Sequence, residues 1–226
     1  MIMTPEPRKF AWSYSALSDF ETCPRRHHET KILKRWVEDD RTHLNEGQEI
    51  HEAMACALKN GSALPAKHAI YQPWINNLLA IPGELMVEQK WALNTEGNAC
   101  AWGSDDAWLR CVADAVKYRP PVAFVTDWKT GKSKNQPEPL QLILTSLIMF
   151  AHYPELKAVT TVFVWLVEDR VTQHTVKNLD IGNEWLKILP RAMEMQRAFE
   201  QQSYPPKPNR WCKRWCPVRS CEFHGK

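Results

Sequence analysis

Three ionisable residues lie in two neighbouring segments with strand-like patterns, and together they could carry out metal-dependent chemistry. Asp114 stands between two alanines in an apolar run, where an ionised carboxylate needs a partner. Asp127 and Lys129 are two residues apart, so on a strand they share one face while Trp128 points away. Two aspartates suit Mg²⁺ or Mn²⁺, and such a cation can activate water and neutralise charge on a phosphodiester. Lys129 could orient that water or stabilise the developing charge.

A simpler interpretation is an ion pair between Asp114 and Lys129 on adjacent strands, and an isolated Asp-x-Lys pattern would favour it. Further residues occur in an order that favours a metal-dependent site over a simple ion pair. The order is Gly47-Gln-Glu-Ile-His51, Asp114, Asp127-Trp-Lys129-Thr-Gly131 and Gln141-Leu142. It resembles the core of the PD-(D/E)XK nucleases, in the RecB-like exonuclease branch that includes the iron-sulfur nucleases of CRISPR adaptation.

The resemblance covers nearly the whole chain and implies a role for each matching residue. His51, Asp114 and Asp127 would bind the divalent metal, and the backbone carbonyl of Trp128 would be a further ligand. Lys129 would be the catalytic lysine. Imidazole is a suitable ligand for Mn²⁺ when the remaining ligands are oxygen, so His51 is compatible with this set.

A histidine packed in the core is the alternative interpretation of His51. Apolar residues recur at steps of three and four along the predicted helix at 44–60, so His51 lies on or beside its buried stripe. The ordered motif favours the ligand over the core residue. Gly47, one turn earlier, would let this helix approach its neighbour closely.

Two further positions of the resemblance are less regular. Gln141 would open the helix that packs beside the site in the family, but Thr145 replaces the tyrosine that often follows four residues later. Glu88 matches a frequent acidic position of the family. A surface pair between Glu88 and Lys90 explains that glutamate equally well. We include Gln141 and Glu88 among the expected catalytic residues.

The C-terminal segment contains three closely spaced cysteines, Cys212, Cys216 and Cys221, which predict a metal site. Tetrahedral zinc with Cys23 or His224 as the fourth ligand is one possibility. A 4Fe-4S cluster held by the three cysteines and Cys23 is the other. The resemblance favours the cluster, because in the iron-sulfur members one N-terminal cysteine joins three C-terminal ones. The C-x3-C-x4-C spacing differs from the commoner C-x2-C pattern followed by a longer gap.

Basic residues gather near both ends of the chain, although the overall charge is only +3. A metal site that joined the ends would bring Arg25, Arg26, Lys213 and Arg214 together as a track for DNA phosphates. A solvated surface is the alternative for these charges. Exposed tryptophan or tyrosine could stack on unpaired bases, but none of the eleven tryptophans is assigned, and most are expected in the core. The remaining cysteines are interpreted as small core residues, namely Cys56, Cys100 and Cys111.

Composition and hydrophobic pattern predict one α/β domain over residues 1–226, with a nuclease core at about 42–201. A hydrophobic fraction of 44% and a charged fraction of 24% are ordinary for a folded protein. We expect a central mixed sheet of about five strands flanked by helices, with segments 13–36 and 204–226 joined by metal into a terminal subdomain. The expected strands are 84–93, 108–118, 122–130, 158–167 and 170–176, and the expected helices are about 15–23, 24–36, 44–60, 137–151 and 181–201.

The strand at 84–93 shows the most regular alternation of the predicted sheet. Leu85, Val87 and Trp91 are expected on one side, and Glu88 on the other. This alternation indicates a strand.

Neither a membrane span nor a secretion signal is expected from the sequence. The most apolar run, 140–151, contains three polar residues and is far shorter than the roughly 20 residues that a span needs. The first residues lack an apolar run after a basic segment, which argues against a secretory signal. We therefore expect a cytoplasmic protein with no membrane partner.

These features together predict a metal-dependent DNA nuclease, with Mg²⁺ or Mn²⁺ at its active site. Exonuclease activity on single-stranded DNA or duplex ends is favoured over cleavage at a specific sequence. The resemblance implies phage-type recombination or CRISPR adaptation, with a protein partner from one of these systems. Two other classes stay open: a non-catalytic DNA-end-binding protein that retains the fold, and an interaction protein stapled by zinc. No residue indicates the oligomeric state.

Overall fold

The computed structural model describes residues 9–36, 42–133 and 139–226. For residues 42–45 it describes the backbone but not the side chains. The chain divides into two compact units. The first unit consists of residues 1–39, 92–110 and 186–226, and the second of residues 40–91 and 111–185. The segments 13–36 and 204–226, which contain the clustered cysteines, therefore belong to the same unit.

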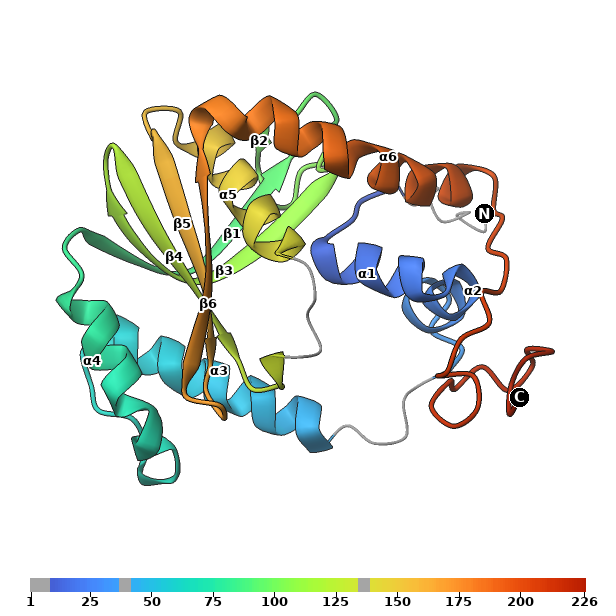
Figure 1. Cartoon of the computed structure of the whole chain (residues 1–226), viewed down its shortest axis with the longest axis horizontal. Coiled ribbons are helices and arrows are strands. Elements are labelled where there is room, and N and C mark those ends of the chain that lie inside the picture. The colour runs from blue at the N-terminus through green and yellow to red at the C-terminus, as the bar shows by residue number, and fades with distance from the viewer. Residues whose placement is uncertain (1–8, 37–41, 134–138) are drawn as a thin grey trace, which may run out of the picture. The chain divides into compact units, whose positions relative to one another are not determined.

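The predicted mixed sheet is confirmed. Its strand order is β2-β1-β3-β4-β5-β6, where β4 and β5 run parallel and the pairs β1/β2, β3/β4 and β5/β6 run antiparallel (Figure 1). Five strands lie within two residues of their predicted bounds. The sixth, β2, has two residues, which is too short for a hydrophobic pattern to reveal. The strands are β1 (Glu84–Leu93), β2 (Ala99–Cys100), β3 (Leu109–Arg119), β4 (Val122–Lys129), β5 (Ala158–Trp165) and β6 (Arg170–Lys177).

Helices cover both faces of the sheet in the second unit. On one face, α3 (Thr42–Asn60) and α4 (Gln72–Ala80) enclose a buried cluster that includes Met54, Ile75 and Trp128. On the other face, α5 (Leu140–His152) packs through Leu142 against the aromatic rings of β5. Residues 66–80, for which the hydrophobic pattern predicted no element, form η2 (Ala66–Tyr71) and α4.

Strand β1 changes face at Glu88, so the regular alternation expected over 84–93 is wrong beyond that residue. Met86 and Trp91 both contact Tyr153, at the end of α5, although strict alternation would place them on opposite faces. Val87 instead packs against the cluster beneath α3 and α4. Glu88 has a φ of 56°, outside the extended region, and such an irregularity shifts the alternation by one residue, as a β-bulge does.

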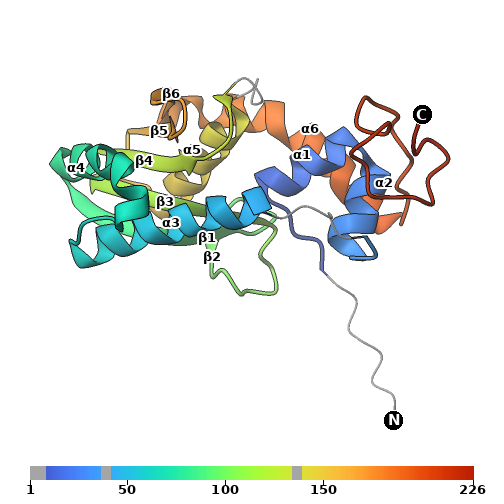
Figure 2. The same ribbon diagram turned by 90° about the horizontal axis from the view of Figure 1, so that it is seen from below.

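The first unit contains helices and a C-terminal tail that lies beside α2 (Figure 2). Ser13 caps the first helix, which begins one residue before its expected start, by accepting a hydrogen bond from the backbone N–H of Ala16. The single helix expected over 24–36 is a four-residue α-helix followed by one π-helical turn that ends at Ile32. The described residues also form the helical elements α1 (Tyr14–Thr22), α2 (Pro24–His27), η1 (His28–Ile32), η4 (Asn178–Asp180) and α6 (Ile181–Glu200).

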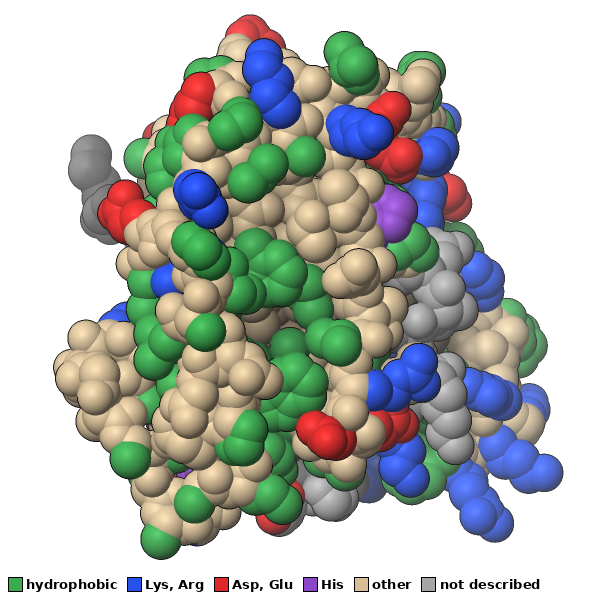
Figure 3. Space-filling view, turned by 60° about the vertical axis from the view of Figure 1, so that its left-hand side comes forward, with side chains coloured by type: hydrophobic (Ala, Val, Ile, Leu, Met, Phe, Trp, Pro, Cys, Tyr) green, Lys and Arg blue, Asp and Glu red, His purple; other side chains and the backbone are tan. Residues whose placement is uncertain are grey.

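The surface carries exposed apolar side chains of the ordinary scattered kind. On the face shown in Figure 3, hydrophobic side chains lie in several groups with backbone and other side chains between them. Ile70 on η2 and Val171 on β6 are examples from the second unit. Within the described part of the chain, no helix has the length and apolar character needed to cross a membrane.

Candidate functional site

Helix α3 carries His51 to the sheet because its apolar stripe is anchored there. Met54 and Leu58 are buried in the cluster beneath α3, and Ile50 packs against the same cluster. Gly47 allows the close approach that the sequence suggested. A Cβ atom at Gly47 would lie 3.0 Å from the side-chain oxygen of Thr130, which follows β4.

Asp114 on β3 connects His51 to β4. His51 Nδ1 lies 3.2 Å from Asp114 Oδ2, and the backbone N–H of Trp128 donates to the same oxygen over 2.8 Å. Burial works to lower the pKa of His51, but the hydrogen bond and negative charge of Asp114 outweigh it and raise that pKa. His51 is therefore a half-buried polar partner of Asp114.

Asp127 and Lys129 share one face of β4, as predicted, and Gln141 on the first turn of α5 joins them. Gln141 Nε2 donates to Asp127 Oδ1 over 2.8 Å, while Lys129 Nζ donates to Gln141 Oε1 over 3.0 Å. Lys129 Nζ also lies 2.7 Å from Asp127 Oδ2 and 4.6 Å from the ring centre of Phe163. Trp128, between them in the sequence, points into the core, so the alternation of β4 places Asp127 and Lys129 together on the opposite face. The simple ion pair between Asp114 and Lys129 is not formed; Lys129 pairs with Asp127.

The environment of Asp127 suits a divalent cation. Its Oδ2 is buried, and the ammonium group of Lys129 lies 2.7 Å from it as an ion-pair partner. Carboxylate oxygens are the ligands that Mg²⁺ and Mn²⁺ prefer. No three histidine, cysteine or carboxylate side chains of the described residues already form a ready-made metal site. Lys129 and His51 provide the positive charges beside the two aspartates.

The protonation of Asp127 predicts how cation binding depends on pH. Burial raises the pKa of Asp127 to about 6, although the charge of Lys129 opposes this rise. Below that pH the cation must displace a proton from Asp127, and above it the remaining proton to displace is the one on His51, whose pKa is also raised. We expect Mn²⁺ affinity to increase from about pH 5 upwards by up to about tenfold per pH unit for each proton displaced, and to level off only above the raised pKa of His51. Titration calorimetry in buffers of different ionisation enthalpy measures both the Mn²⁺ affinity and the number of protons released on binding. An affinity that does not change with pH, without proton release, would contradict the role of Asp127 as a metal ligand.

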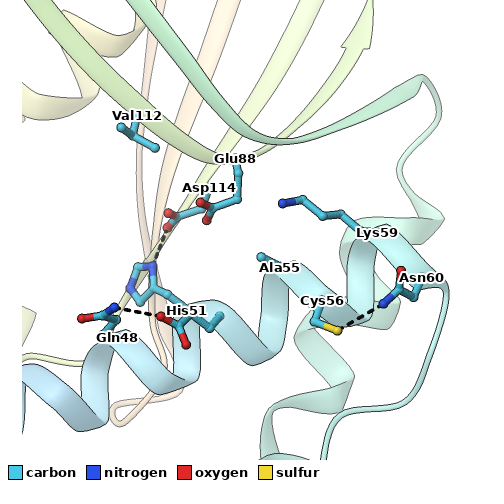
Figure 4. A pocket seen from close by; sticks show the side chains of 10 residues that line it. Gln48, His51, Ala55, Cys56, Lys59, Asn60, Glu88, Val112 and Asp114 are labelled. Atoms are coloured by element: carbon cyan, nitrogen blue, oxygen red, sulfur yellow. Dashed lines mark hydrogen bonds and ion pairs between the residues drawn. The ribbon is translucent and has the colours of Figure 1, made fainter.

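A pocket of about 600 Å³ lies between α3 and the strands β1 and β3 (Figure 4). His51, Asp114 and Glu88 line it together. The shift in β1 places Glu88 on the α3 side, so the structure brings this glutamate beside the two other expected site residues. A non-glycine residue with positive φ is uncommon in a strand, and such strained positions cluster at functional sites.

The pocket also contains polar residues of α3 that the sequence analysis missed. Gln48, Lys59 and Asn60 line it, and Lys59 extends from the helix towards Glu88 and Asp114 (Figure 4). Gln48 and Lys59, three residues before and eight residues after His51, lie towards the same side of α3, whereas Asn60 is the last residue of the helix. Helical spacing from His51 was the signal that could have identified Gln48 and Lys59.

Two of the cysteines interpreted as small core residues have other surroundings. Cys56 is exposed on α3 and lines the pocket, where its sulfur accepts a hydrogen bond from Asn60. Cys111 on β3 lies 3.4 Å from the hydroxyl of Thr145, which also donates to the carbonyl of Gln141. Burial raises the pKa of the Cys111 thiol to about 11, so this thiol stays neutral.

The four cysteines expected to bind a metal line one small cavity in the first unit, namely Cys23, Cys212, Cys216 and Cys221. Backbone N–H groups point at two of the sulfurs, from Lys207 to Cys23 at 3.4 Å and from Asn209 to Cys212 at 3.5 Å. Burial raises the pKa of the Cys216 thiol, and Cys212 and Cys23 are close enough to add to this effect. His224 does not line this cavity.

The four basic residues expected to contact DNA lie in the first unit and differ in their surroundings. Arg25 pairs with Glu222 over 2.9 Å, and Arg26 lies 3.8 Å from Asp19. Both arginines border the cysteine cavity, so part of their role is structural. Lys213 and Arg214 are exposed instead.

Comparisons with known proteins agree with this architecture. Residues 11–221 match a family model described as the PD-(D/E)XK nuclease superfamily. Among solved structures, a protein from Eubacterium rectale named "Putative exonuclease" is 15% identical, with a TM-score of 0.57 over 97% of this chain and 94% of that one. The structure named SSO0001 is also 15% identical, with a TM-score of 0.46 over 96% of this chain and 89% of that one. No curated protein matches the chain.

Proposed function

Because the chain belongs to the PD-(D/E)XK nuclease superfamily, we propose that it is a divalent-metal-dependent DNA exonuclease of the RecB-like branch. The bonded set of Asp127, Lys129 and Gln141, which Asp114 joins through the backbone of Trp128, carries this proposal. Fold alone would not indicate an activity, since one fold serves many functions. The shared fold with a protein named as an exonuclease is compatible with the narrower activity.

Each polar residue of the site has a task in this proposal. His51, Asp114, Asp127 and the carbonyl of Trp128 would hold Mg²⁺ or Mn²⁺. When bound, the cation would lower the pKa of a water molecule and neutralise charge on the phosphodiester. Lys129 would orient the water and stabilise the developing negative charge. Its ammonium group is already held in place by Asp127 and by Gln141.

The pocket beside His51 would receive the DNA strand next to the bond that is cleaved. Its volume of about 600 Å³ lies within the range of about 300–1,000 Å³ usual for ligand pockets. Lys59 offers a positive charge to a backbone phosphate, and Gln48 and Asn60 offer amide groups. Glu88 faces the same space and would act near the metal. A pocket of this size favours a single strand over a duplex.

The cysteine cavity would hold a 4Fe-4S cluster, with zinc as the alternative. The four cysteines that line this cavity would be its ligands, and they would have to draw closer together to hold it. The two N–H groups that point at sulfur are the kind of contact that stabilises thiolate ligands. The cluster would join α2 to the C-terminal tail as a staple of the first unit. Phage-type recombination and CRISPR adaptation are the proposed settings for this branch, with a protein partner from one of them.

A cleavage assay tests the proposal directly. The protein is purified without oxygen and incubated with end-labelled single strands, linear duplexes and circular single strands, each with Mg²⁺, with Mn²⁺ and without a divalent metal. We expect metal-dependent degradation of the linear substrates and survival of the circles. Degradation of the circles would indicate an endonuclease. Binding to linear DNA without degradation under any condition would favour the DNA-end-binding alternative.

A further inference from the structure

Two tryptophans of the C-terminal tail differ from all the others in their exposure. All eleven tryptophans lie in the described residues, and nine of them are buried or half-buried. Trp211 and Trp215 are 41% and 71% exposed. A large apolar ring in water loses the free energy that burial would provide, so two such rings four residues apart need an explanation.

The two rings stand on one tight turn that is anchored to the helices of the first unit. The backbone N–H groups of Trp215 and Cys216 both donate to the carbonyl of Trp211 over 2.9 Å. Asn209 accepts a hydrogen bond from the backbone of Trp211 and donates to the carbonyl of Thr22 at the end of α1. The turn is therefore held in place before any partner arrives, which lowers the entropy cost of binding.

The turn is also strongly basic. Residues 205–226 contain Lys207, Arg210, Lys213, Arg214, Arg219 and Lys226, but a single acidic residue, Glu222. Glu222 already pairs with Arg25. The guanidinium of Arg210 lies 4.8 Å from the ring centre of Trp211, and no described carboxylate pairs with Lys213 or Arg214.

We propose that Trp215, flanked by Lys213 and Arg214, is a stacking site for an unpaired base of single-stranded DNA. Aromatic rings interleaved with basic side chains are the combination that binds single strands without sequence preference, because every base has a flat face. The positive charge favours a polyanion over an apolar protein surface as the occupant. This inference rests on the proposal that the chain acts on DNA, and it assigns a second contact in the first unit, outside the catalytic residues.

Binding measurements on three variants of Trp215 test the site. Trp215→Ala removes the ring, Trp215→Leu keeps apolar area without a flat π-face, and Trp215→Phe restores an aromatic ring. Fluorescence anisotropy with labelled oligothymidylate, without divalent metal, gives the dissociation constants. We expect the Ala and Leu variants to bind between about fivefold and about 100-fold more weakly than the wild-type chain, and the Phe variant to bind within about threefold of it.

An oligonucleotide of the same length with abasic sites throughout is the matched control. All four proteins should bind it equally, with the same dependence on salt, because their charges are the same. Equal metal content and melting temperature would show that the neighbouring cysteines are undisturbed. Wild-type affinity in the Leu variant, or an equal loss on the abasic oligonucleotide, would overturn the stacking site. If the wild-type chain cleaves DNA and the Trp215 variants bind it as tightly as the wild type, this inference alone is overturned. If the wild-type chain neither binds nor cleaves DNA, the proposed function is overturned as well.

Discussion

Replacing Lys129 by glutamine is expected to slow DNA cleavage by at least about 100-fold while leaving DNA binding nearly unchanged. The ammonium group stands 2.7 Å from Asp127 and 3.0 Å from Gln141, where it can stabilise charge that develops only during the reaction. Loss of one such group typically costs about 100-fold to 1,000-fold in rate. Glutamine retains an N–H donor for Asp127, so the variant avoids leaving this buried carboxylate without a partner.

Lys157→Gln is the matched control for this experiment. Lys157 is an exposed lysine of the same unit, and its replacement removes the same charge outside the site. Single-turnover cleavage of an end-labelled strand, with saturating Mn²⁺ and protein, measures the chemical step. We expect the control to cleave at the wild-type rate. Wild-type cleavage by Lys129→Gln would remove this residue from the proposed mechanism, and an equal loss in both variants would trace the effect to net charge.

Replacing Cys216 by serine is expected to remove the bound metal from the first unit and to lower its melting temperature by about 10 °C or more. Cys216 shares its cavity with the three other proposed ligands, and three thiolates hold a metal poorly. Metal binding at such a site contributes directly to folding, and each kcal/mol lost shifts the melting temperature of a unit of about 100 residues by several degrees.

The control for Cys216 is Cys100→Ser. Cys100 belongs to the same unit but does not line the cavity, so its replacement should preserve both metal content and stability. Metal analysis and a visible spectrum of anaerobically purified protein distinguish iron, with its broad visible absorption, from colourless zinc. Unchanged metal content in Cys216→Ser would contradict the proposed ligand set, and zinc in the wild-type chain would change only the identity of the staple.

The predictions from sequence succeeded where strict periodicity governs the chain. A strand places every second residue on one face, so Asp127 and Lys129 could be placed together, and Trp128 in the core, from their spacing alone. The position of His51 beside a buried stripe followed in the same way from helical spacing. The contact between Lys129 and Gln141 needed the fold as well, because it joins a strand to the following helix.

The predictions failed where the backbone departs from periodicity. Nothing in the sequence marks the positive φ of Glu88, so the change of face in β1 was not foreseen, although the resemblance had included this carboxylate among the catalytic residues. Helix α4 was missed although Pro73 stands in its first turn and Ile75 and Leu78 follow at helical spacing. Contacts across long stretches of sequence, such as Arg25 with Glu222, depend on tertiary structure and leave no local signal.

The first unit combines residues from both ends of the chain, so it can be completed only when synthesis reaches the C-terminal segment. Cys23 and Glu21, at the end of α1, receive hydrogen bonds from Lys207, which is made more than 180 residues later. At about 5–20 residues per second, the N-terminal helices wait about 10 to 40 s for these partners. The second unit, residues 40–91 and 111–185, is synthesised within that interval. The nuclease core can therefore form while the N-terminal helices are still exposed to chaperones and proteases, and capture of the metal would be the final step of maturation.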